Sequence, residues 1–375
     1  MSSVIECKRC VMSNEADPDI TFNAEGICNH CQRYDNLVNT RIASPETRDQ
    51  EFKALIERIK RDGKGKEYDC LVGVSGGVDS TYVAYLAKTH GLRPLAVHFD
   101  NGWDSELAVK NIQQVLNRLN IDLVTYVVDW EEFRDLQLSF LKASVPDGEI
   151  PTDHGIDALV WRQASKYDIK YILSGMNFVT ESISVPSWAY GHSDWKYISG
   201  VQKKFGSQKL KSFPHFSFLY LFYVNLIRRV RIVSLLNYVH YNKGETKAFL
   251  SRELGWVDYG GKHFESIYTR FFQGVILPQK FGIDKRIGHL SDLINAGQIT
   301  KAEAREELAA PTYDTNLQRQ DRLYVIKKLG LTEAQYDVLM TQPVKSFREY
   351  PNSYAVVQFL RNGVNVLRRF GLYPK

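Results

Sequence analysis

The pattern of apolar and polar residues alternates between strand-like and helix-like segments from residue 68 to residue 178. Residues 68–74 form a short apolar run typical of a buried parallel strand, and residues 81–87 continue at helical spacing. The same alternation predicts strands at 95–100, 122–128 and 169–173, and helices at 105–119, from near Glu131, and at 156–167. It predicts an α/β fold with a parallel, doubly wound sheet.

Other patterns surround and interrupt this region. Residues 51–59 carry apolar side chains at helical spacing. Residues 145–155, with two prolines, three acidic residues and a histidine, predict a loop. Beyond Ser291 the chain reads as mainly helical, and capping-box patterns at Thr300–Glu303 and Thr332–Gln335 predict two helix starts.

The composition is that of a globular chain. Apolar residues make up 44% of the 375 residues and charged residues 24%, which allows two or three domains with cores of their own. The net charge of +5 is too small to indicate nucleic acid as a partner. Residues 1–6 lack the charged and apolar regions of a secretory signal, so we expect a cytoplasmic protein.

Four of the five cysteines stand in pairs with metal-ligand spacing. Cys7 and Cys10 form one pair, and Cys28 and Cys31 form the other after seventeen intervening residues. Two such pairs complete a tetrahedral Zn²⁺ site, and four protein ligands leave no open position, so we expect structural zinc. Disulfides are the alternative, disfavoured in a reducing compartment, and His30 could replace one cysteine as a ligand.

The turn after the first strand carries the strongest chemical signal. It reads Ser-Gly-Gly-Val-Asp-Ser at 75–80. Its glycines let the backbone approach a ligand, and the free amides of the following helix form a ready anion site. No Gly-Lys-Ser/Thr follows at the Walker A spacing. The motif resembles the PP-loop of the ATP pyrophosphatases, which implies ATP cleavage between the α and β phosphates; an ordinary glycine turn is the alternative.

Further nucleotide contacts are expected where neighbouring strands end, because doubly wound sheets bind ligands at the carboxyl ends of their strands. Ser174-Gly175 at one such end resembles the second nucleotide contact of PP-loop enzymes. Asp79 is the predicted Mg²⁺ ligand. The predicted ATP-binding residues are Ser75, Gly76, Gly77, Val78, Asp79, Ser80, Phe99, Asp100, Ser174 and Gly175.

A second polar cluster lies at 254–290. Gly260-Gly261 forms a flexible joint before a group of basic residues that could neutralise a polyphosphate as its α–β bond breaks. A solvated helix face with two turns is the alternative. The predicted catalytic residues are Asp79, Lys262, His263, Lys280, Lys285 and Arg286.

Residues 180–245 break the strand–helix alternation. Residues 181–195 are rich in Ser, Trp, Tyr and His, which suits a substrate-facing loop. The stretch 203–231 places twelve mostly apolar residues, 216–227, between clusters of Lys and Arg, too few to span a bilayer. We favour packing on the core or a homo-oligomer interface over weak contact with a membrane surface.

The arrangement as a whole resembles the N-acetyl sugar amidotransferases of bacterial surface-polysaccharide pathways, including lipopolysaccharide O-antigen synthesis. The resemblance covers most of the chain and rests on the four cysteines, the turn at 75–80, and the segments 255–266 and 280–286. It implies conversion of an acetamido group on a nucleotide-activated sugar to an acetamidino group. The amide oxygen would attack the α-phosphate of ATP, and ammonia would then displace AMP.

The expected source of ammonia is a separate protein. An N-terminal cysteine glutaminase needs Cys at position 2, where Ser2 stands, and Cys70 lies inside the first strand. We therefore expect a synthetase subunit supplied by a separate glutaminase, which free ammonia can replace.

Two other functions stay open. One is a tRNA-modifying PP-loop enzyme that adenylates its substrate; thiolation is disfavoured because only Cys70 remains outside the zinc motif. The other is a non-catalytic nucleotide-binding zinc scaffold. The expected domains are a zinc module at 1–40, an ATP-binding domain at 41–180, a substrate or oligomer region at 181–245 and a mainly helical region at 246–375.

Overall fold

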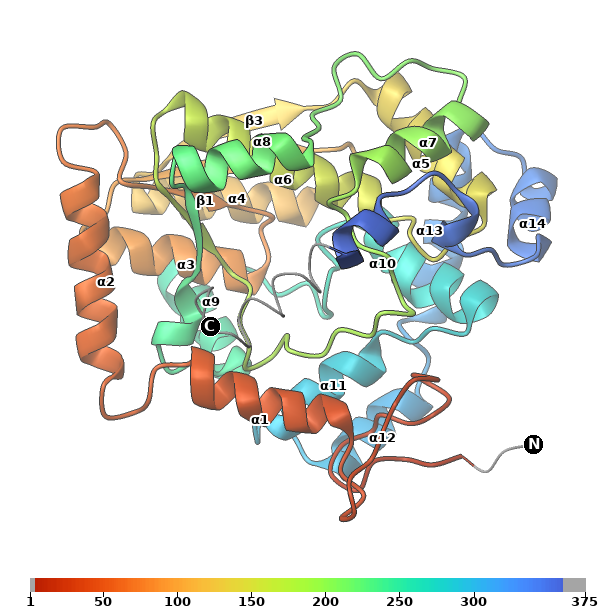
Figure 1. Ribbon diagram of the computed structural model, residues 1–375, viewed down its shortest axis with the longest axis horizontal. Helices are drawn as coiled ribbons and strands as arrows, with labels where there is room; N and C mark the ends of the chain where they lie inside the picture. The colour runs from red at the N-terminus through yellow and green to blue at the C-terminus, as the bar shows by residue number, and fades with distance from the viewer. Residues whose placement is uncertain (1–3, 360–375) are drawn as a thin grey trace.

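The computed structural model describes residues 4–359 and has one parallel sheet with helices around it (Figure 1). Within these residues the sheet has five strands in the order β3-β2-β1-β4-β5, and each neighbouring pair is parallel. The strands are β1 (Cys70–Gly73), β2 (Pro94–Asp100), β3 (Asp122–Val127), β4 (Tyr171–Ser174) and β5 (Arg231–Ser234). The predicted parallel sheet is confirmed, and edge strand β5 is an addition to it.

The helices precede, separate and follow the strands in the sequence, and they surround the sheet in space. Ser2 and the end of the expected C-terminal region lie outside the described residues. The α-helices are α1 (Asn29–Arg41), α2 (Arg48–Asp62), α3 (Val78–Thr89), α4 (Glu106–Leu119), α5 (Trp130–Ala143), α6 (Ile150–Lys166), α7 (Trp195–Phe205), α8 (Phe218–Phe222), α9 (Lys243–Leu254), α10 (Ile267–Phe271), α11 (Arg286–Asn295), α12 (Lys301–Ala309), α13 (Thr315–Leu329) and α14 (Glu333–Thr341). The π and 3₁₀ segments are η1 (Tyr223–Ile227), η2 (Leu235–Tyr238), η3 (Phe272–Phe281) and η4 (Phe347–Glu349).

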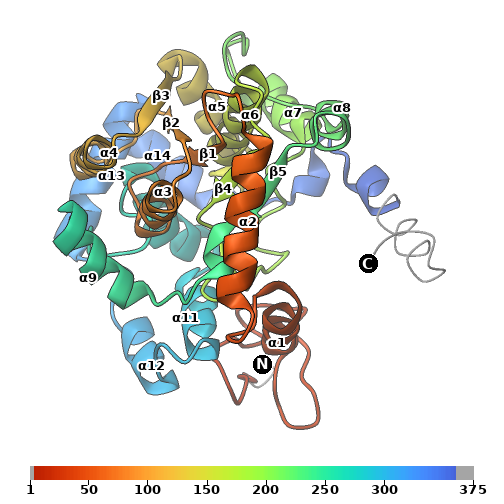
Figure 2. The ribbon, with the colours of Figure 1, turned by 90° about the vertical axis from the view of Figure 1, so that its left-hand side faces the viewer.

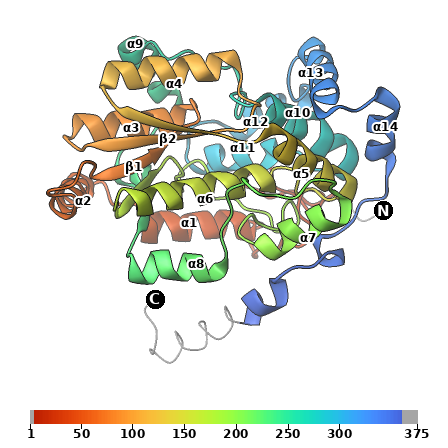
Figure 3. The same ribbon diagram turned by 90° about the horizontal axis from the view of Figure 1, so that it is seen from above.

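Helices cover both faces of the sheet because its central strands are apolar on both sides. In β1, Leu71 packs into the core formed with α5 and α6, whereas Cys70 and Val72 pack into the core formed with α2 and α3. Figure 3 shows α3 and α4 on one side of the strands and α6 on the other. Burial on both faces explains the continuous apolar runs of these strands and confirms the doubly wound arrangement.

Helix α6 begins earlier than its apolar pattern predicts. The predicted loop at 145–155 is helical from Ile150 onward, with Pro151 in the first turn. Proline is favoured there because the first turn does not need its missing N–H. Gly155 then sits against the core, where an added Cβ would lie 2.5 Å from Phe99 Cζ. The prediction of a loop at 150–155 is therefore wrong.

The four-cysteine segment packs against the C-terminal helices. Helix α1 contacts α11, and Cys31 Sγ lies 3.2 Å from Asn295 Oδ1. Lys301 of α12 pairs with Glu6 at 2.7 Å. Figures 1 and 2 show α1, α11 and α12 together at one end of the molecule. The two predicted capping boxes are confirmed at the starts of α12 and α14.

Candidate active site

The turn at 75–80 joins β1 to α3 at the carboxyl edge of the sheet. Gly77 is the N-cap of α3 and has no side chain to bond the first-turn amides, which leaves these N–H groups for an anion. The Gly77 amide donates to Ser75 Oγ at 3.3 Å, and the hydroxyls of Ser75 and Ser80 lie 3.5 Å apart. The turn therefore gathers amides and hydroxyls in one place, which suits a phosphate group.

Gly76 is required by the geometry of this turn. Its φ is +82°, and an added Cβ would lie 2.7 Å from Tyr259 Oη and 2.9 Å from the Ala108 carbonyl oxygen. Its own carbonyl accepts hydrogen bonds from Trp256 Nε1 at 2.7 Å and from Tyr259 Oη at 2.8 Å. The segment after α9 thus holds the turn in place from outside.

Gly76→Ala is expected to lower ATP turnover about tenfold or more, because the added methyl group must displace Tyr259 and the turn. Gly65→Ala is the matched control. Gly65 also has a positive φ of +80°, but an added Cβ there meets nothing within 4 Å. Steady-state rates and melting curves of both variants test this. Equal losses of turnover in the two variants would contradict the role given to Gly76.

The end of β4 lies directly against the turn. A Cβ added at Gly175 would lie 3.0 Å from both Asp79 Cβ and the Ser80 amide nitrogen. The Ser174 hydroxyl accepts a hydrogen bond from the Met176 amide at 3.1 Å and so shapes the bend that follows β4. The structure therefore brings the 174–175 pair to the first turn of α3, the place where a nucleotide contact is predicted.

The side chain of Phe99 at the end of β2 packs in the core. The Phe99 ring is 7% exposed and stacks on Tyr126 with ring centroids 6.1 Å apart. Asp100 Oδ1 accepts a hydrogen bond from the Gly102 amide at 2.8 Å, which closes the turn after β2. Because the ring is in the core, a ligand at this strand end could contact only the backbone of Phe99 and the Asp100 carboxylate.

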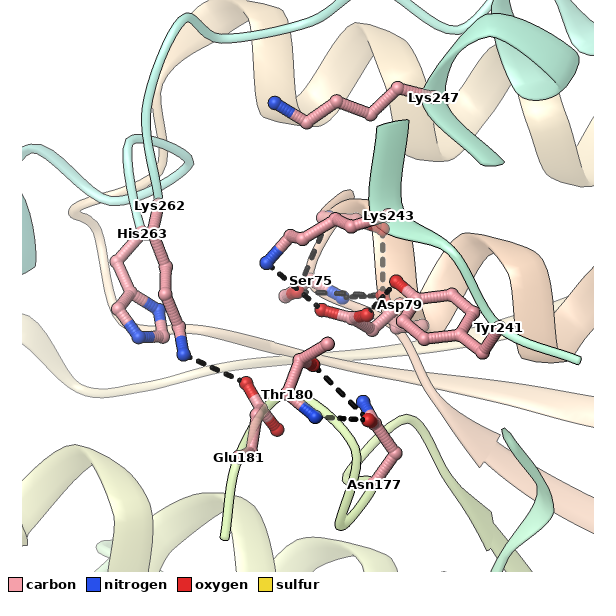
Figure 4. A network of polar contacts seen from close by, with 12 residues as sticks. Ser75, Asp79, Asn177, Thr180, Glu181, Tyr241, Lys243, Lys247, Lys262 and His263 are labelled. Carbon is pink, nitrogen blue, oxygen red and sulfur yellow. Dashed lines mark hydrogen bonds and ion pairs between the residues drawn. The ribbon is translucent and has the colours of Figure 1, made fainter. Parts of the chain in front are cut away.

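Asp79 stands in the first turn of α3 and has two partners from the segment before and at the start of α9. The Tyr241 hydroxyl donates a hydrogen bond to its Oδ1, and Lys243 Nζ lies 3.8 Å from its Oδ2 (Figure 4). Burial raises the pKa of the Asp79 carboxyl, against the opposing effect of the Lys243 charge. Burial also lowers the pKa of Lys243. The two groups form a partly buried charged pair at the mouth of the turn.

A second charged pair joins the loop after β4 to the loop before α10. Lys262 Nζ lies 3.0 Å from Glu181 Oε1 (Figure 4). Burial opposes ionisation of both groups, but their mutual attraction and hydrogen bond outweigh it, so the pKa of Glu181 is lowered and that of Lys262 is raised. The charges of Lys243 and Lys262 both oppose the effect of burial on the pKa of the Asp79 carboxyl. The structure therefore brings the predicted residues Asp79 and Lys262 together. With Glu181, Tyr241 and Lys243 they form what we call the Asp79 cluster.

His263 and Glu265 complete this side of the site. His263 has a φ of +63°, which is unusual for a residue other than glycine and marks a constrained backbone. Its Nδ1 lies 3.7 Å from Glu265 Oε1. Burial opposes ionisation of Glu265, but its closeness to His263 lowers the pKa of its carboxyl. The same Oε1 lies 3.4 Å from the place where a Cβ on Gly77 would be, so this loop faces the turn.

Lys243→Met is expected to raise the KM for ATP about tenfold, because it removes a cation from the place where phosphate charge would lie. Lys247→Met is the matched control one turn further along α9. Lys247 Nζ pairs with Asp258 at 2.8 Å and lies apart from the Asp79 cluster in Figure 4. ATP saturation curves measure the difference. A KM that rises equally in both variants would indicate a general loss of positive charge.

The other three predicted basic residues have partners of their own. Lys280 donates to the Leu339 carbonyl at the end of α14, in a pocket with Leu141, and burial lowers the pKa of Lys280 to about 8. Arg286 binds Asp284 through both carboxylate oxygens and the main chain at the end of α12. None of these contacts joins Lys280 or Arg286 to the Asp79 cluster.

Lys285 is the N-cap residue of α11, and its side chain contacts Glu149 at the start of α6. Its Nζ is 3.1 Å from Glu149 Oε2, and Gln273 Nε2 donates to the same carboxylate oxygen at 2.8 Å. The contact ties the loop before α11 to the N-terminal end of α6. A catalytic role for Lys280, Lys285 and Arg286 stays a prediction that these contacts do not support.

Glu181, Tyr241 and Lys243 also belong to the cluster, but no motif in the sequence predicts them. Glu181 opens the stretch 181–195, whose composition suits a substrate-facing loop but does not mark any single residue. Lys243 did carry a signal, because it stands in the first turn of α9, where the helix dipole disfavours a cation. A lysine at that position indicates a role outside its own helix.

The four predicted zinc ligands converge in one buried place. The Sγ atoms of Cys7, Cys10, Cys28 and Cys31 all lie within 4.8 Å of one another. Cys7 Sγ is 3.9 Å from Cys31 Sγ, and Cys10 Sγ is 3.7 Å from Cys28 Sγ. A tetrahedron of Zn–S bonds of about 2.3 Å has edges of about 3.8 Å, so these residues fit zinc. The distances exclude disulfides in this structure, since an S–S bond is about 2.05 Å.

Other groups around the cysteines support this arrangement. The Cys28 amide donates to Cys7 Sγ at 3.3 Å, and the Cys31 amide donates to Cys28 Sγ at 3.4 Å. Such amide bonds stabilise thiolates. His30 Nε2 lies 2.7 Å from Asp17 Oδ2, so His30 has another partner and the four sulfurs are the ligand set.

Two family models match parts of the chain. A model described as "LPS biosynthesis protein WbpG-like, C-terminal domain" matches residues 265–362, and one described as "Queuosine biosynthesis protein QueC" matches residues 69–159. The QueC match contains the turn at 75–80, and the WbpG-like match begins at Glu265, which faces that turn. They confirm the predicted resemblance to the PP-loop ATP pyrophosphatases, which use ATP, and to a family of surface-polysaccharide biosynthesis, here matched by the WbpG-like model of lipopolysaccharide biosynthesis.

Individual relatives cover less of the chain or resemble it only weakly. A tRNA(Ile)-lysidine synthase of Chlamydia pneumoniae is 37% identical over 70 residues, which are 18% of this chain and 22% of that protein. The chain therefore matches less than a quarter of the length of this curated relative.

Solved structures give weak likenesses. An NH3-dependent NAD synthetase of Campylobacter jejuni is 13% identical, with a TM-score of 0.32 over 79% of this chain and 98% of that one. An NMN synthetase of Francisella tularensis is 16% identical, with a TM-score of 0.33 over 77% of this chain and 98% of that one.

Proposed function

We propose that the protein is an ATP-dependent amidotransferase that forms AMP and pyrophosphate and converts an N-acetyl group on a nucleotide-activated sugar to an acetamidino group. The observation that carries this proposal is the contact between its two matched regions. Glu265 of the WbpG-like region faces the Gly77 position of the PP-loop turn, and its carbonyl accepts a hydrogen bond from the Ser105 amide at 2.8 Å. A turn suited to ATP and a domain of lipopolysaccharide biosynthesis thus share one site.

The first proposed step activates the amide. The amide oxygen attacks the α-phosphorus of ATP, the bond between that phosphorus and the α–β bridging oxygen breaks, and pyrophosphate leaves. Amides at the start of α3 would hold the phosphates, and Lys243 and Lys262 would balance the charge that develops on the leaving group. Asp79 would hold Mg²⁺ together with phosphate oxygens, and the ion would supply Lewis-acid polarisation of the phosphates.

The second proposed step replaces the oxygen. Ammonia adds to the imidate carbon and loses a proton, and the C–O bond then breaks to release AMP. Activation is needed because an amide oxygen is a poor leaving group until it is esterified to AMP. The pair of Glu181 and Lys262 would lie beside the reacting groups, where a fixed charge pair can orient them without costly reorganisation.

Ammonia is proposed to come from a separate glutaminase. Four cysteines form the metal cluster, and Cys70 is buried in β1, where burial raises the pKa of its thiol. A glutaminase nucleophile needs an accessible thiol that ionises readily. Ammonium salts should therefore support turnover alone, whereas glutamine should support it only with a partner enzyme.

The second candidate is a tRNA-adenylating enzyme, and the match to tRNA(Ile)-lysidine synthase is the observation that favours it. The net charge of +5 gives it little support, because tRNA-binding surfaces are strongly basic. AMP formation that depends on added tRNA, together with retention on tRNA that falls steeply with salt, would favour this candidate over the sugar amidotransferase.

The test of the proposed function is product analysis with ATP, Mg²⁺, ammonium and a panel of nucleotide-linked acetamido sugars, including a UDP-linked diacetamido sugar acid. We expect AMP and pyrophosphate in equal amounts, and a sugar product in which NH has replaced one oxygen. ADP and phosphate as products would contradict the PP-loop assignment. ATP binding without pyrophosphate release on any sugar or tRNA would favour a nucleotide-binding scaffold.

A further inference from the structure

The helical segment formed by α8 and η1 presents an apolar face to solvent. We call this surface the α8 face; its residues are Phe218, Leu219, Phe222, Tyr223, Leu226 and Ile227. Leu219 is 82% exposed and Ile227 65% exposed. Single exposed apolar residues are ordinary, but six of them on ten consecutive helical residues form a patch that needs a partner.

The segment is attached to the protein by its opposite side. Val224 is buried, and the Tyr220 hydroxyl lies 3.5 Å from Ser165 Oγ on α6. Arg228 pairs with Asp168 at 2.8 Å just beyond α6. Figure 3 shows α8 alongside α6, on the side of α6 that faces away from the sheet. The stretch therefore packs on the core through this side, as predicted, and the α8 face on the other side of the helix stays exposed.

Positive charges predominate around the α8 face, where Asp168 is the carboxylate that pairs with Arg228. No Asp or Glu occurs between Asp194 and Glu245, whereas this stretch holds nine Lys and Arg residues. Arg229 and Arg231 follow the helix directly and are exposed, and neither forms an ion pair with another described residue. Ile232 beside them is also exposed, on edge strand β5. An apolar helix face beside unpaired arginines is thus a local feature of both sequence and structure.

We propose that the α8 face binds the surface of an anionic membrane. Its apolar side chains would lie at the boundary between headgroups and acyl chains, and Arg229 and Arg231 would contact lipid phosphates. None of the described helices is long and apolar enough to cross a membrane, so the contact is with one leaflet. The inference does not rest on the proposed reaction.

Charge favours lipid over a second copy of the chain as the occupant. In a two-fold dimer through the α8 face, the arginines of the two copies would be brought toward one another, with no carboxylate in this stretch to pair with them. An anionic bilayer supplies both an apolar layer and the opposite charge.

The test is flotation of the full-length protein with vesicles of phosphatidylcholine alone and of phosphatidylcholine with about 30% phosphatidylglycerol. We expect binding to the anionic vesicles only, and binding that falls as salt is raised. The double variant Leu219→Glu/Leu226→Glu should lower binding about tenfold or more, and Arg229→Gln/Arg231→Gln should weaken it and reduce its salt dependence. ATP turnover without vesicles should be unchanged in both.

The matched control is Leu323→Glu/Val338→Glu, which changes two apolar side chains that are similarly exposed, 57% and 58%, on α13 and α14. It should float as the unchanged protein does. The proposal would be overturned if the unchanged protein failed to float with anionic vesicles or if the Leu219→Glu/Leu226→Glu variant floated equally well. A solution mass showing a dimer that the same variant makes monomeric would overturn it in favour of a second copy.

Discussion

Asp79→Asn is expected to lower kcat/KM for AMP and pyrophosphate formation about a thousandfold, while the protein stays folded. The Asp79 carboxylate accepts a hydrogen bond from the Tyr241 hydroxyl, and its Oδ2 lies 3.8 Å from Lys243 Nζ. An amide in its place keeps the shape but loses the charge that would hold Mg²⁺ at the turn. Burial raises the pKa of Asp79, so its ionised form costs stability at neutral pH, and the neutral amide should leave Tm unchanged or higher.

Pyrophosphate release and thermal melting measure the two effects separately. The matched control is Asp337→Asn, which removes a carboxylate from an exposed ion pair with Arg322 at 3.0 Å. Exposed pairs contribute little, so this variant should keep both turnover and Tm. Turnover by Asp79→Asn close to that of the unchanged protein would show that this carboxylate is not needed at the turn.

The second large effect is expected from Cys7→Ser/Cys10→Ser. Loss of two thiolates should remove bound zinc and lower Tm by about 10 °C or more, because a structural zinc site contributes directly to folding. Atomic absorption of the purified protein and a melting curve check this. Cys70→Ala is the matched control, since it removes a buried cysteine outside the cluster and should leave the zinc content unchanged.

Loss of zinc should also lower ATP turnover, because a chain of contacts joins the cysteine cluster to the candidate active site. Cys31 Sγ lies 3.2 Å from Asn295 at the end of α11. On the same helix, the Asp292 carboxylate accepts hydrogen bonds from the Ser182 hydroxyl at 2.5 Å and from the Ile183 amide at 2.9 Å. These two residues directly follow Glu181 in the chain. A folded, zinc-free double variant with full activity would contradict both the structural role of the metal and this connection.

The sheet could be predicted from the sequence because its central strands are short continuous apolar runs, whereas the helices between them are apolar at helical spacing. Val72 and Leu71 pack on opposite faces of β1, so the run had to be apolar throughout. Strand β5 could not be predicted in this way. It is an edge strand whose first residues, Arg231 and Ile232, are exposed, so it has no continuous apolar run.

The site was predictable only where a local motif marks it. The turn at 75–80 and the four cysteines are short motifs with fixed spacing. The pair of Glu181 and Lys262 joins residues far apart in the sequence, and nothing in either segment shows that the two will meet. Lys280 and Arg286 were predicted to be catalytic because they are basic. In the structure Lys280 donates to the Leu339 carbonyl and Arg286 donates to Asp284.

Isotope labelling can follow the amide oxygen itself through the proposed reaction. A nucleotide-linked acetamido sugar carrying heavy oxygen in its acetamido carbonyl would be converted in unlabelled water with ATP, Mg²⁺ and ammonium. If the amide oxygen attacks the α-phosphorus, the label must appear in the phosphate of AMP and be absent from pyrophosphate. Heavy oxygen recovered in water, in pyrophosphate or in inorganic phosphate would contradict the proposed adenylation.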